Sequence, residues 1–454
     1  MTGKQLLKQL TNEHILIVGF GYRTGLLTSN FLMQKDITVS ISDNKNESEL
    51  SNLFQKLIKQ PENFYTGNQT EEQLKGIDRI ILSPGVPFAI PLIQSAVKRG
   101  IPVWSEIELA YRFLPDGVKI IGVTGTDGKS TTVSLIHHIL KTKFNSFLGG
   151  NIGTPFISFV ENITPGDVVV LELSSYQLEY NETFNCDIAC ILNIAEDHLD
   201  RYSSFDEYIN AKENILKSQR KQDIAILNAD DSSFKRHLNC VKGKLVSFSK
   251  FSSKKTDAYI DNNSIFYNNK KICSTDILKI KGVHNLENTL CSVAVACELS
   301  VDFEKIHTAL STFEGLHHRN EFIRTFNGID FINDSKATTI NAVKKALESQ
   351  EKPVILMLGG RDKGLDFSQL DSLIEKKTKN IILFGEARDK IASQIKNGKK
   401  YDRIADFTMA VTEAYKKANK GDVVLLSPGC TSWDVFSSYE ERGDFFRKIV
   451  LEFK

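Results

Sequence analysis

Residues 120–131 decide the fold of this chain, and they read Ile-Ile-Gly-Val-Thr-Gly-Thr-Asp-Gly-Lys-Ser-Thr. The pattern predicts an apolar strand, a glycine-rich turn and the start of a helix. Backbone N–H groups of such a turn and the positive end of the helix dipole favour a bound phosphate. Lys129 would reach the outer phosphates of a nucleotide, and the Ser130 hydroxyl would ligate Mg²⁺. Five residues rather than four separate Gly122 from Gly128, a departure from the standard spacing. An ordinary strand–turn–helix is the alternative, but it has little use for a Lys-Ser-Thr run.

Composition places the chain among ordinary globular proteins. Its residues are 41% hydrophobic and 25% charged, which is ordinary for a globular protein. Its length of 454 residues predicts about three domains. A net charge of +1 gives no electrostatic reason to expect nucleic acid or a membrane surface as a partner. The first residues lack the apolar region of a signal peptide, and no apolar run is long enough for a membrane span. Seven cysteines at irregular spacings indicate reduced thiols. We therefore expect a cytoplasmic monomer.

Residues 1–115 form the first predicted α/β domain. An apolar strand at 14–18 leads into Gly-Phe-Gly-Tyr-Arg-Thr-Gly at 19–25, and a second strand ends at Asp43. This order is typical of a dinucleotide-binding unit, although the glycine spacing is one residue too long, so NAD binding remains open. A third strand at 79–82 precedes another tight turn, Ser-Pro-Gly. Ser105 followed by Glu108 predicts a capping box at the start of the domain's last helix.

Residues 116–313 form the second predicted domain, built on the phosphate loop. A buried strand at 167–172 ends in Glu172, and another at 188–193 is followed shortly by His198. Ligands of open parallel sheets lie outside the carboxyl ends of the strands, so both side chains should lie near a nucleotide on the loop. For Glu172 we favour a contact to Mg²⁺ over the alternative of a solvated strand end.

Lys212 falls on the apolar stripe of a predicted helix that begins at Ser204. One interpretation is a lysine whose ammonium reaches solvent past the edge of the core. The other is a desolvated amine that adds CO₂ and becomes a carbamate, an oxygen ligand for Mg²⁺. The sequence does not decide between the two.

Residues 314–454 form the third predicted domain. Apolar strands at 354–358, 380–384 and 423–427 each run into a glycine turn, with helical patterns between them. Such alternation predicts a parallel, Rossmann-like sheet. The whole chain is therefore expected to be α/β with three domains: a Rossmann-like N-terminal domain, a central P-loop ATPase-type domain and a Rossmann-like C-terminal domain.

Taken together, the motifs resemble the Mur ligase family from end to end. The phosphate loop reads GTDGKST, and Asn151 lies in GGNIGTP. The other matching segments are LELSSYQLE, NIAEDHLDRY, YINAKENIL and HNLENTLCSVA, followed by His-His-Arg and Asp-Ser-Lys motifs in the last domain. The resemblance implies an ATP-dependent ligase that activates a carboxylate as an acyl phosphate and joins it to an amino acid.

The resemblance also implies roles for individual residues. The implied catalytic residues are Lys129, Glu172, His198, Lys212 and Lys336, of which Glu172, His198, carbamylated Lys212 and Ser130 would hold Mg²⁺. The implied ATP-binding residues are Gly125, Thr126, Asp127, Gly128, Lys129, Ser130, Thr131, Asn285, Asn288, Arg319 and Asp334. The N-terminal domain would hold a UDP-linked substrate through Gly21, Thr24, Asp43, Asn44, Ser83, Pro84, Gly85 and, from the central domain, Asn151.

The C-terminal Ser-Pro-Gly-Cys-Thr-Ser-Trp-Asp segment resembles family members that add D-glutamate to UDP-N-acetylmuramoyl-L-alanine in peptidoglycan precursor synthesis. D-Glutamate would be held by Thr338, Lys363, Ser432 and Tyr439, the last at a position more often phenylalanine. No Asp-Asn-Pro-Arg run, typical of the diaminopimelate ligases, occurs. The alternatives are another Mur ligase, a folylpolyglutamate synthase-like ligase, and a P-loop ATPase without ligase chemistry.

Overall fold

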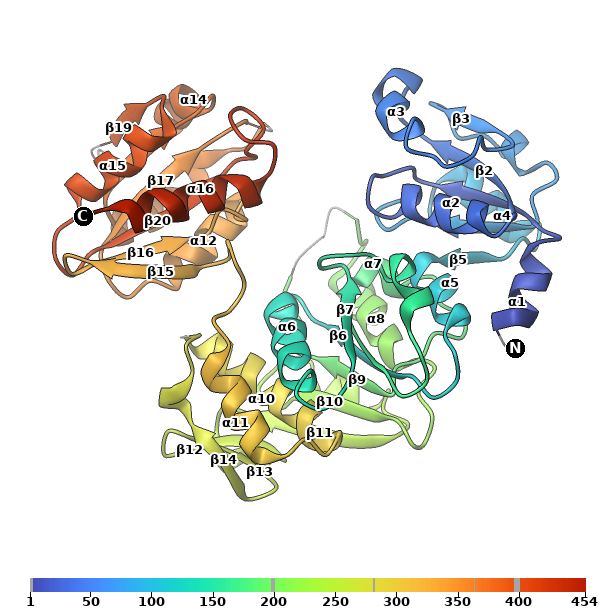
Figure 1. Cartoon of the computed structure of the whole chain (residues 1–454), viewed down its shortest axis with the longest axis horizontal. Coiled ribbons are helices and arrows are strands. Elements are labelled where there is room, and N and C mark those ends of the chain that lie inside the picture. The colour runs from blue at the N-terminus through green and yellow to red at the C-terminus, as the bar shows by residue number, and fades with distance from the viewer. Residues whose placement is uncertain (1–2, 197–200, 281, 363, 396–400) are drawn as a thin grey trace. The chain divides into compact units, whose positions relative to one another are not determined.

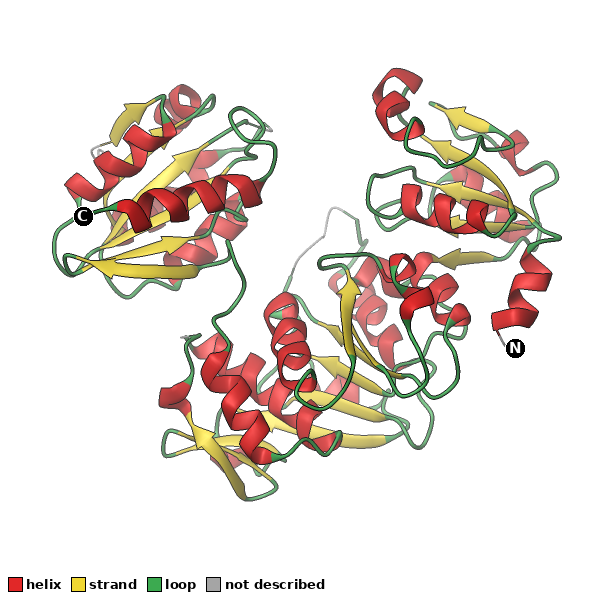
Figure 2. Cartoon of the chain, viewed as in Figure 1, coloured by secondary structure: helices red, strands yellow, loops and turns green. Residues whose placement is uncertain are grey.

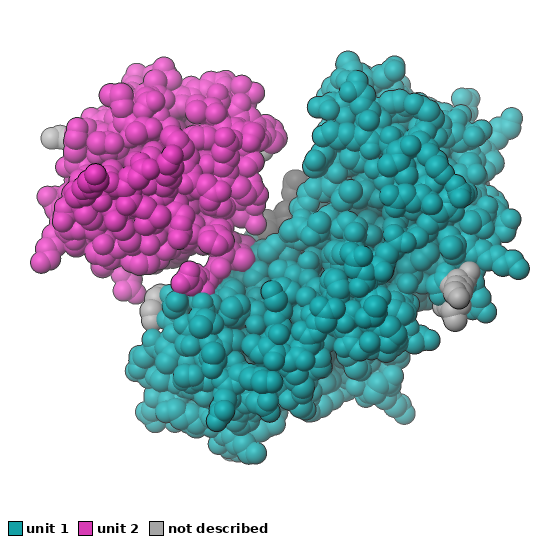
Figure 3. Space-filling view, in the orientation of Figure 1, with its two compact units in different colours: residues 1–313 teal, residues 314–454 magenta. Residues whose placement is uncertain are grey.

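The computed structural model describes residues 3–196, 201–280, 282–362, 364–395 and 401–454. It divides into two compact units, Met1–Phe313 and Glu314–Lys454 (Figure 3). Helices and strands alternate along both units, as Figures 1 and 2 show. All seven cysteines lie in the described part of the chain and carry free thiols. No helix among the described residues is long and apolar enough to cross a membrane.

The first unit begins with a five-stranded parallel sheet in the order β3-β2-β1-β4-β5. After His14, the central strand β1 is an uninterrupted apolar run, because neighbouring strands and helices on the two faces shield it from water. The strands are β1 (His14–Val18), β2 (Thr38–Asp43), β3 (Phe64–Thr66), β4 (Arg79–Leu82) and β5 (Val103–Ser105). The helices are α1 (Gly3–Leu10), α2 (Gly25–Gln34), α3 (Glu47–Phe54), α4 (Pro91–Lys98) and α5 (Glu106–Phe113).

A nine-stranded sheet follows in the same unit, in the order β14-β13-β12-β11-β10-β9-β6-β8-β7. Its strands are β6 (Lys119–Thr124), β7 (Ser146–Gly150), β8 (Val168–Glu172), β9 (Ile188–Ile191), β10 (Ile224–Asn228), β11 (Lys244–Ser249), β12 (Ala258–Asp261), β13 (Ser264–Tyr267) and β14 (Lys270–Ser274). Its helices are α6 (Lys129–Leu140), α7 (Ser175–Leu178), α8 (Phe205–Glu213), α9 (Phe234–Leu238), α10 (Val283–Glu298) and α11 (Phe303–Thr312).

The edge of this sheet departs from the expected parallel arrangement. Strands β12, β13 and β14 pair antiparallel, joined by turns at Asn262–Asn263 and Asn268–Asn269. All four asparagines have positive φ, between 44° and 61°. Two-residue hairpin turns of this hand match the twist of the strands, and asparagine tolerates the conformation. The two Asn-Asn pairs were the sequence signal for these hairpins.

The second unit is a six-stranded sheet in the order β15-β16-β20-β17-β18-β19, parallel except for β15. Its strands are β15 (Glu321–Phe326), β16 (Ile329–Asn333), β17 (Val354–Gly359), β18 (Thr378–Phe384), β19 (Tyr401–Ile404) and β20 (Val423–Gly429). Its helices are α12 (Ile340–Glu348), α13 (Asp371–Lys377), α14 (Arg388–Gln394), α15 (Phe407–Lys417) and α16 (Tyr439–Glu452). The α/β prediction with three parallel-rich sheets is confirmed, with antiparallel strands at two edges as the correction.

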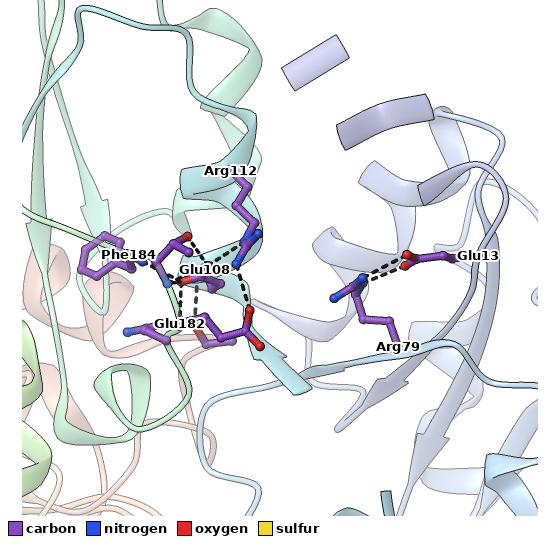
Figure 4. A network of polar contacts seen from close by, with 9 residues as sticks. Glu13, Arg79, Glu108, Arg112, Glu182 and Phe184 are labelled. Carbon is purple, nitrogen blue, oxygen red and sulfur yellow. Dashed lines mark hydrogen bonds and ion pairs between the residues drawn. The ribbon is translucent and has the colours of Figure 1, made fainter. Parts of the chain in front are cut away.

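Helix α5 fastens the first sheet to the second. Ser105 accepts the N–H of Glu108 at 3.0 Å, which is half of the expected capping box. The Glu108 carboxylate does not return to Ser105; it accepts N–H groups of Glu182 and Phe184 at 3.1 and 2.8 Å, and Arg112 at 2.6 Å (Figure 4). This buried carboxylate therefore joins α5 to the loop that leads into β9.

Glu106, two residues earlier, is a second buried carboxylate between these parts. Its Oε1 accepts the N–H of Ile157 at 2.6 Å. Burial raises the pKa of Glu106 to about 7, although hydrogen bonds from the Ile157 and Phe156 backbone and the charge of Arg23 lower it. The folded protein thus holds a proton at Glu106 that the unfolded chain releases at lower pH.

We expect Glu106→Gln to stabilise the first unit in a pH-dependent way. Because the native pKa lies above the unfolded value, the free energy of unfolding of the native protein falls as pH rises from about 4.5 to 7. Glutamine keeps an acceptor for Ile157 and does not ionise. The stability gain over wild type should therefore be larger at pH 8 than at pH 5 by about 2–3 kcal/mol. Thermal or denaturant unfolding at both pH values checks this.

The exposed Glu62→Gln is the matched control in the same unit. A Glu106→Gln gain that is equal at pH 5 and pH 8 would contradict the assignment.

Candidate functional site

The predicted phosphate loop is present between β6 and α6. The strand ends at Thr124 and the helix begins at Lys129, with Gly128 as its N-cap at φ 81°. Loop N–H groups are themselves held: Thr126 N donates to Asn193 O at 2.8 Å, and Asp127 N donates to Asn193 Oδ1 at 2.8 Å. The loop is therefore fixed at the carboxyl end of the sheet, next to a helix N-terminus suited to anions.

Gly128 is required because Asn288 of α10 packs against it. A Cβ built on Gly128 would lie 2.2 Å from Asn288 Oδ1. The same oxygen accepts the Thr132 hydroxyl at 3.1 Å, and Asn288 Nδ2 donates to Asn285 Oδ1 at 3.1 Å. Asn288 thus packs against the phosphate loop at Gly128 and bonds to the first turn of α6 at Thr132. The contact of Asn285 and Asn288 with ATP, which the resemblance implies, stays a prediction.

Two lysines converge on one carbonyl of the loop. Lys129 Nζ donates to Gly125 O at 2.8 Å and to Thr126 O at 2.7 Å. Lys212 Nζ, from α8, also donates to Gly125 O at 2.8 Å. Only 2% of Lys212 is exposed, and its Nζ lies 4.6 Å from the centre of the Tyr208 ring. The interpretation in which its ammonium reaches solvent is therefore wrong, because the chain buries it against the loop.

Glu172 offers an oxygen that fits a cation. It ends β8, directly opposite Val123 of the loop strand, and is 3% exposed. Its Oε1 accepts Asn151 Nδ2 at 2.8 Å, while its buried Oε2 has no hydrogen-bond partner within the described residues. An orphaned carboxylate oxygen beside a phosphate loop fits a hard divalent cation.

The rest of the predicted metal site is only partly described. Ser130 lies in the first turn of α6, 6% exposed. His198 lies outside the described residues. Among the residues that are described, no group of three His, Cys, Asp or Glu side chains could by itself hold a metal ion. The fit to Mg²⁺ accordingly depends on Glu172 and Ser130.

The longer glycine turn of the first sheet reaches across to the second sheet. Arg23, within the turn, donates from Nη2 to Gly153 O at 2.6 Å and from Nη1 to Asn151 O at 3.3 Å. Asn151 also donates its backbone N–H to Glu172 O at 2.8 Å. The added residue in this turn thus ties it to the loop that carries Asn151, a contact that sequence reasoning missed.

Asp43 holds the glycine turn through its carboxylate. Its Oδ2 accepts the N–H of Phe20 at 2.6 Å and its Oδ1 accepts the N–H of Lys45 at 2.9 Å. The side chain is 7% exposed, whereas Asn44 and Gly21 are exposed and Thr24 is half-buried. Contact of these residues with uridine or phosphate remains a prediction.

The Ser83-Pro84-Gly85 turn lines a pocket with the central domain. Ser83 Oγ donates to Gly19 O at 2.6 Å, so the two predicted phosphate turns touch. The opposite side of the pocket carries Tyr176, Gln177, Tyr180 and Arg201. Arg201 donates to Glu179 Oε2 at 2.9 Å and lies 4.1 Å from the Tyr176 ring centre. Arg201 lies within the NIAEDHLDRY segment, but sequence reasoning gave it no role.

The second unit gathers its predicted residues after β16 and β20. Asp334 is buried; the hydroxyl of Ser427 and the N–H of Asn320 donate to it at 2.9 and 3.0 Å. Burial raises the pKa of Asp334 to about 7 despite these donors and the charge of Arg319. Arg319 itself is exposed.

Lys336, Ser432 and Tyr439 also lie in this region. The Lys336 Nζ is 5.8 Å from the centre of the Tyr439 ring. Ser432 is buried, and Thr338 is half-buried two residues before α12 begins at Ile340. Lys363 lies outside the described residues. The D-glutamate contacts expected of this set stay a prediction.

These features define an α/β protein with a phosphate-binding loop in one unit and a Rossmann-like second unit. Sequence comparison then names its family. Residues 13–105 match the Mur ligase MurD-like N-terminal domain, residues 123–296 the Mur ligase middle domain, and residues 318–430 the Mur ligase glutamate ligase domain. The chain belongs to the Mur ligase family, as its motifs predicted.

Curated relatives match over nearly the whole chain. The UDP-N-acetylmuramoylalanine–D-glutamate ligase of Koribacter versatilis is 41% identical over 96% of this chain and 97% of its own length. The ligase of the same name from Caldicellulosiruptor saccharolyticus is 38% identical over 98% of this chain and 99% of its own length. The prediction that the chain is a ligase is confirmed.

Solved structures show the same fold at lower identity. UDP-N-acetylmuramate-alanine ligase MurC of Thermotoga maritima is 21% identical with a TM-score of 0.56, covering 97% of this chain and all of its own. MurF of Acinetobacter baumannii is 18% identical with a TM-score of 0.59, covering 100% of this chain and 99% of its own. Both support a shared architecture.

We expect Gly128→Ala to distort the phosphate loop. The new Cβ would clash with Asn288, and φ 81° is strained for alanine, which together should cost about 1–3 kcal/mol of stability. Affinity for a fluorescent ATP analogue should fall at least about tenfold, since loop N–H groups no longer converge.

Gly153→Ala is the control, because Gly153 also has a positive φ of 57° but open space around its Cβ position. Thermal unfolding and nucleotide titration of both variants check the prediction, and equal nucleotide affinity in the two would refute it.

Proposed function

We propose that this chain is an ATP-dependent ligase that adds D-glutamate to UDP-N-acetylmuramoyl-L-alanine during cytoplasmic synthesis of peptidoglycan precursors. The observation that carries the proposal is the pair of lysines on the Gly125 carbonyl, together with the orphaned Glu172 oxygen at the end of the neighbouring strand β8. The names of relatives up to 41% identical over nearly the whole chain support the choice of substrates.

In the first step, a carboxylate oxygen of the alanyl substrate attacks the γ-phosphorus of ATP. The bond to the β,γ-bridging oxygen breaks, ADP leaves, and an acyl phosphate forms. Both reactants are anionic, so the barrier depends on neutralising charge. Lys129 and the loop N–H groups are placed at the start of α6 for this task.

Glu172 and Ser130 would hold Mg²⁺ at this position. The cation would supply charge neutralisation between the outer phosphates. Asn151 donates a hydrogen bond to Glu172 Oε1, so Oε2 is the oxygen that would contact the cation.

In the second step, the amine of D-glutamate attacks the acyl carbonyl carbon, and inorganic phosphate leaves as the amide forms. Water competes with the amine for the acyl phosphate, so exclusion of water raises yield. We assign Thr338, Ser432, Tyr439 and Lys363 to D-glutamate, and Lys336, Arg319 and Asp334 to completing the ATP site.

We further propose that Lys212 is carbamylated in the active enzyme. The neutral amine adds to the carbon of CO₂, and a proton is released. Two ammonium groups that share one carbonyl acceptor repel each other, and the carbamate replaces one of them by an anion. The burial of Lys212 supports this assignment.

The reaction itself is tested with a panel of amino acids. Purified protein with ATP, Mg²⁺ and UDP-N-acetylmuramoyl-L-alanine should release phosphate with D-glutamate at least about a hundredfold faster than with D-alanine, L-glutamate or meso-diaminopimelate. Comparable rates for D-glutamate and D-alanine would refute the assignment. ATP turnover that needs no amino acid would indicate an ATPase without ligase chemistry.

We expect Lys212→Ala and Lys212→Arg both to lose at least about a hundredfold in kcat, since neither can carry a carbamate. Both should remain folded by thermal unfolding. Added formate or acetate should partly restore the alanine variant and leave the arginine variant unchanged. Lys217→Ala, at an exposed lysine nearby, is the control. Normal turnover by the arginine variant would contradict the proposal.

A further inference from the structure

Arg442 is a fully buried arginine in the second unit. It lies in the first turns of α16 with 0% exposure. Its Nε donates to Ser335 Oγ at 2.9 Å, and its Nη2 donates to Ser335 O at 2.9 Å and to Cys430 O at 3.1 Å. One guanidinium therefore binds the Asp-Ser-Lys segment and the Gly-Cys-Thr-Ser segment together.

The loops around this guanidinium follow three adjacent strands. β16, β20 and β17 are neighbours in the sheet, and Ser335, Cys430 and Gly360 follow their carboxyl ends. Gly429 N donates to Ala337 O at 2.8 Å, and Arg361 N donates to Thr431 O at 2.9 Å, so the three loops touch. The carboxyl edge of adjacent parallel strands is where such sheets bind ligands.

The remaining nitrogen of Arg442 has no partner. Nη1 is buried and makes no hydrogen bond within the described residues. It faces Gly360, where an added Cβ would lie 3.0 Å from it. Arg442 forms no ion pair with any described carboxylate, since its three bonds go to a hydroxyl and two carbonyls.

The charge nevertheless persists at neutral pH. Desolvation lowers the pKa of Arg442 to about 10, while nearby Cys430 and Asp434 raise it. Asp434 is already engaged, because its Oδ2 accepts the N–H of Glu386 at 3.0 Å. A buried cation that forms no ion pair with a described carboxylate is costly to fold, and an incoming anion removes part of that cost.

We propose that Arg442 is a positioning residue that also supplies a fixed positive charge to the loops assigned above to the amino acid, so that these loops select an amino acid with a second carboxylate. This inference rests on the proposed function. The guanidinium acts through Ser335 and Cys430, which carry Lys336 and the Thr431–Ser432 pair, and it touches no reacting atom.

An arginine that only holds loops together would behave differently from one whose positive charge stabilises a ligand carboxylate. Loss of a structural tie would impair every amino acid and every step alike. Loss of a buried charge would weaken a ligand with an ionised side-chain carboxylate and spare its neutral amide. D-Glutamate and D-glutamine differ in that respect alone and have nearly the same shape.

The test compares Arg442→Gln, Arg442→Lys and the control Arg447→Gln in the full chain. Arg447 is also on α16, but it is paired with Glu321 at 2.6 Å and 38% exposed on its side chain. KM for D-glutamate and for ATP, kcat, and the inhibition or substrate constant for D-glutamine are measured by phosphate release. Arg442→Gln should raise KM for D-glutamate at least about tenfold and change the D-glutamine constant less than about threefold. Arg442→Lys should restore most of the loss, and Arg447→Gln should match wild type.

The inference would be overturned if Arg442→Gln raised the D-glutamate KM and the D-glutamine constant by the same factor. It would also be overturned if the D-glutamate KM of Arg442→Lys rose as much as that of Arg442→Gln. Should Arg442→Gln fail to fold, Arg442→Lys decides, because it keeps the charge with fewer donors. A D-glutamate KM within about threefold of wild type then supports the inference, and a tenfold rise refutes it. A wild type that does not use D-glutamate would instead refute the proposed function.

Discussion

The carbonyl of Gly125 is the point on which the phosphate site depends. It accepts the ammonium groups of Lys129 and Lys212, which come from different helices, at 2.8 Å each. Two ammonium groups on one oxygen repel each other, and the proposed carbamate on Lys212 would relieve that repulsion while Lys129 keeps its positive charge at the expected phosphate position. Asn288 behind Gly128 and Asn193 beside Thr126 keep that carbonyl in place. The loop is thus preorganised for a phosphate before any ligand binds.

The second unit also holds buried ionisable side chains in place through hydrogen bonds. Asp334 and Arg442 are both buried at the carboxyl ends of neighbouring strands, yet they do not pair with each other among the described contacts. Asp334 is held by a hydroxyl and a backbone N–H, and Arg442 by a hydroxyl and two carbonyls. Burial has opposite effects on them, since it favours the proton on Asp334 and disfavours it on Arg442.

Sequence patterns predicted those parts of the site that depend on residues close together in the chain. The Gly-Lys-Ser-Thr run predicted the phosphate loop, and helical spacing placed Lys212 on the core-facing side of its helix, because periodicity reports which face meets the core. The spacing did not decide whether the Lys212 ammonium is buried or reaches solvent. The partners of these residues were not predictable in the same way. Asn288 meets Gly128 across 160 residues, and Arg442 is buried against Ser335 and Cys430, which come from two other loops. In sequence, Glu-Glu-Arg-Gly-Asp resembles an exposed helix start, so nothing distinguishes a buried guanidinium from a solvated one.

The phosphate-loop residues and the loops around Arg442 belong to different units of the chain. The phosphate loop, Glu172 and Lys212 lie before Phe313, whereas the loops around Arg442 lie after Glu314. Each set is fixed by contacts within its own unit, so the geometry of either one does not depend on the other being in place. Substitutions at Arg442 should therefore change amino-acid selection, and those at Gly128 should change nucleotide binding. In the double variant, the two changes in binding free energy should be additive. In the proposed ligase reaction, turnover uses ATP and the amino acid together, so in a turnover assay the two substitutions should couple.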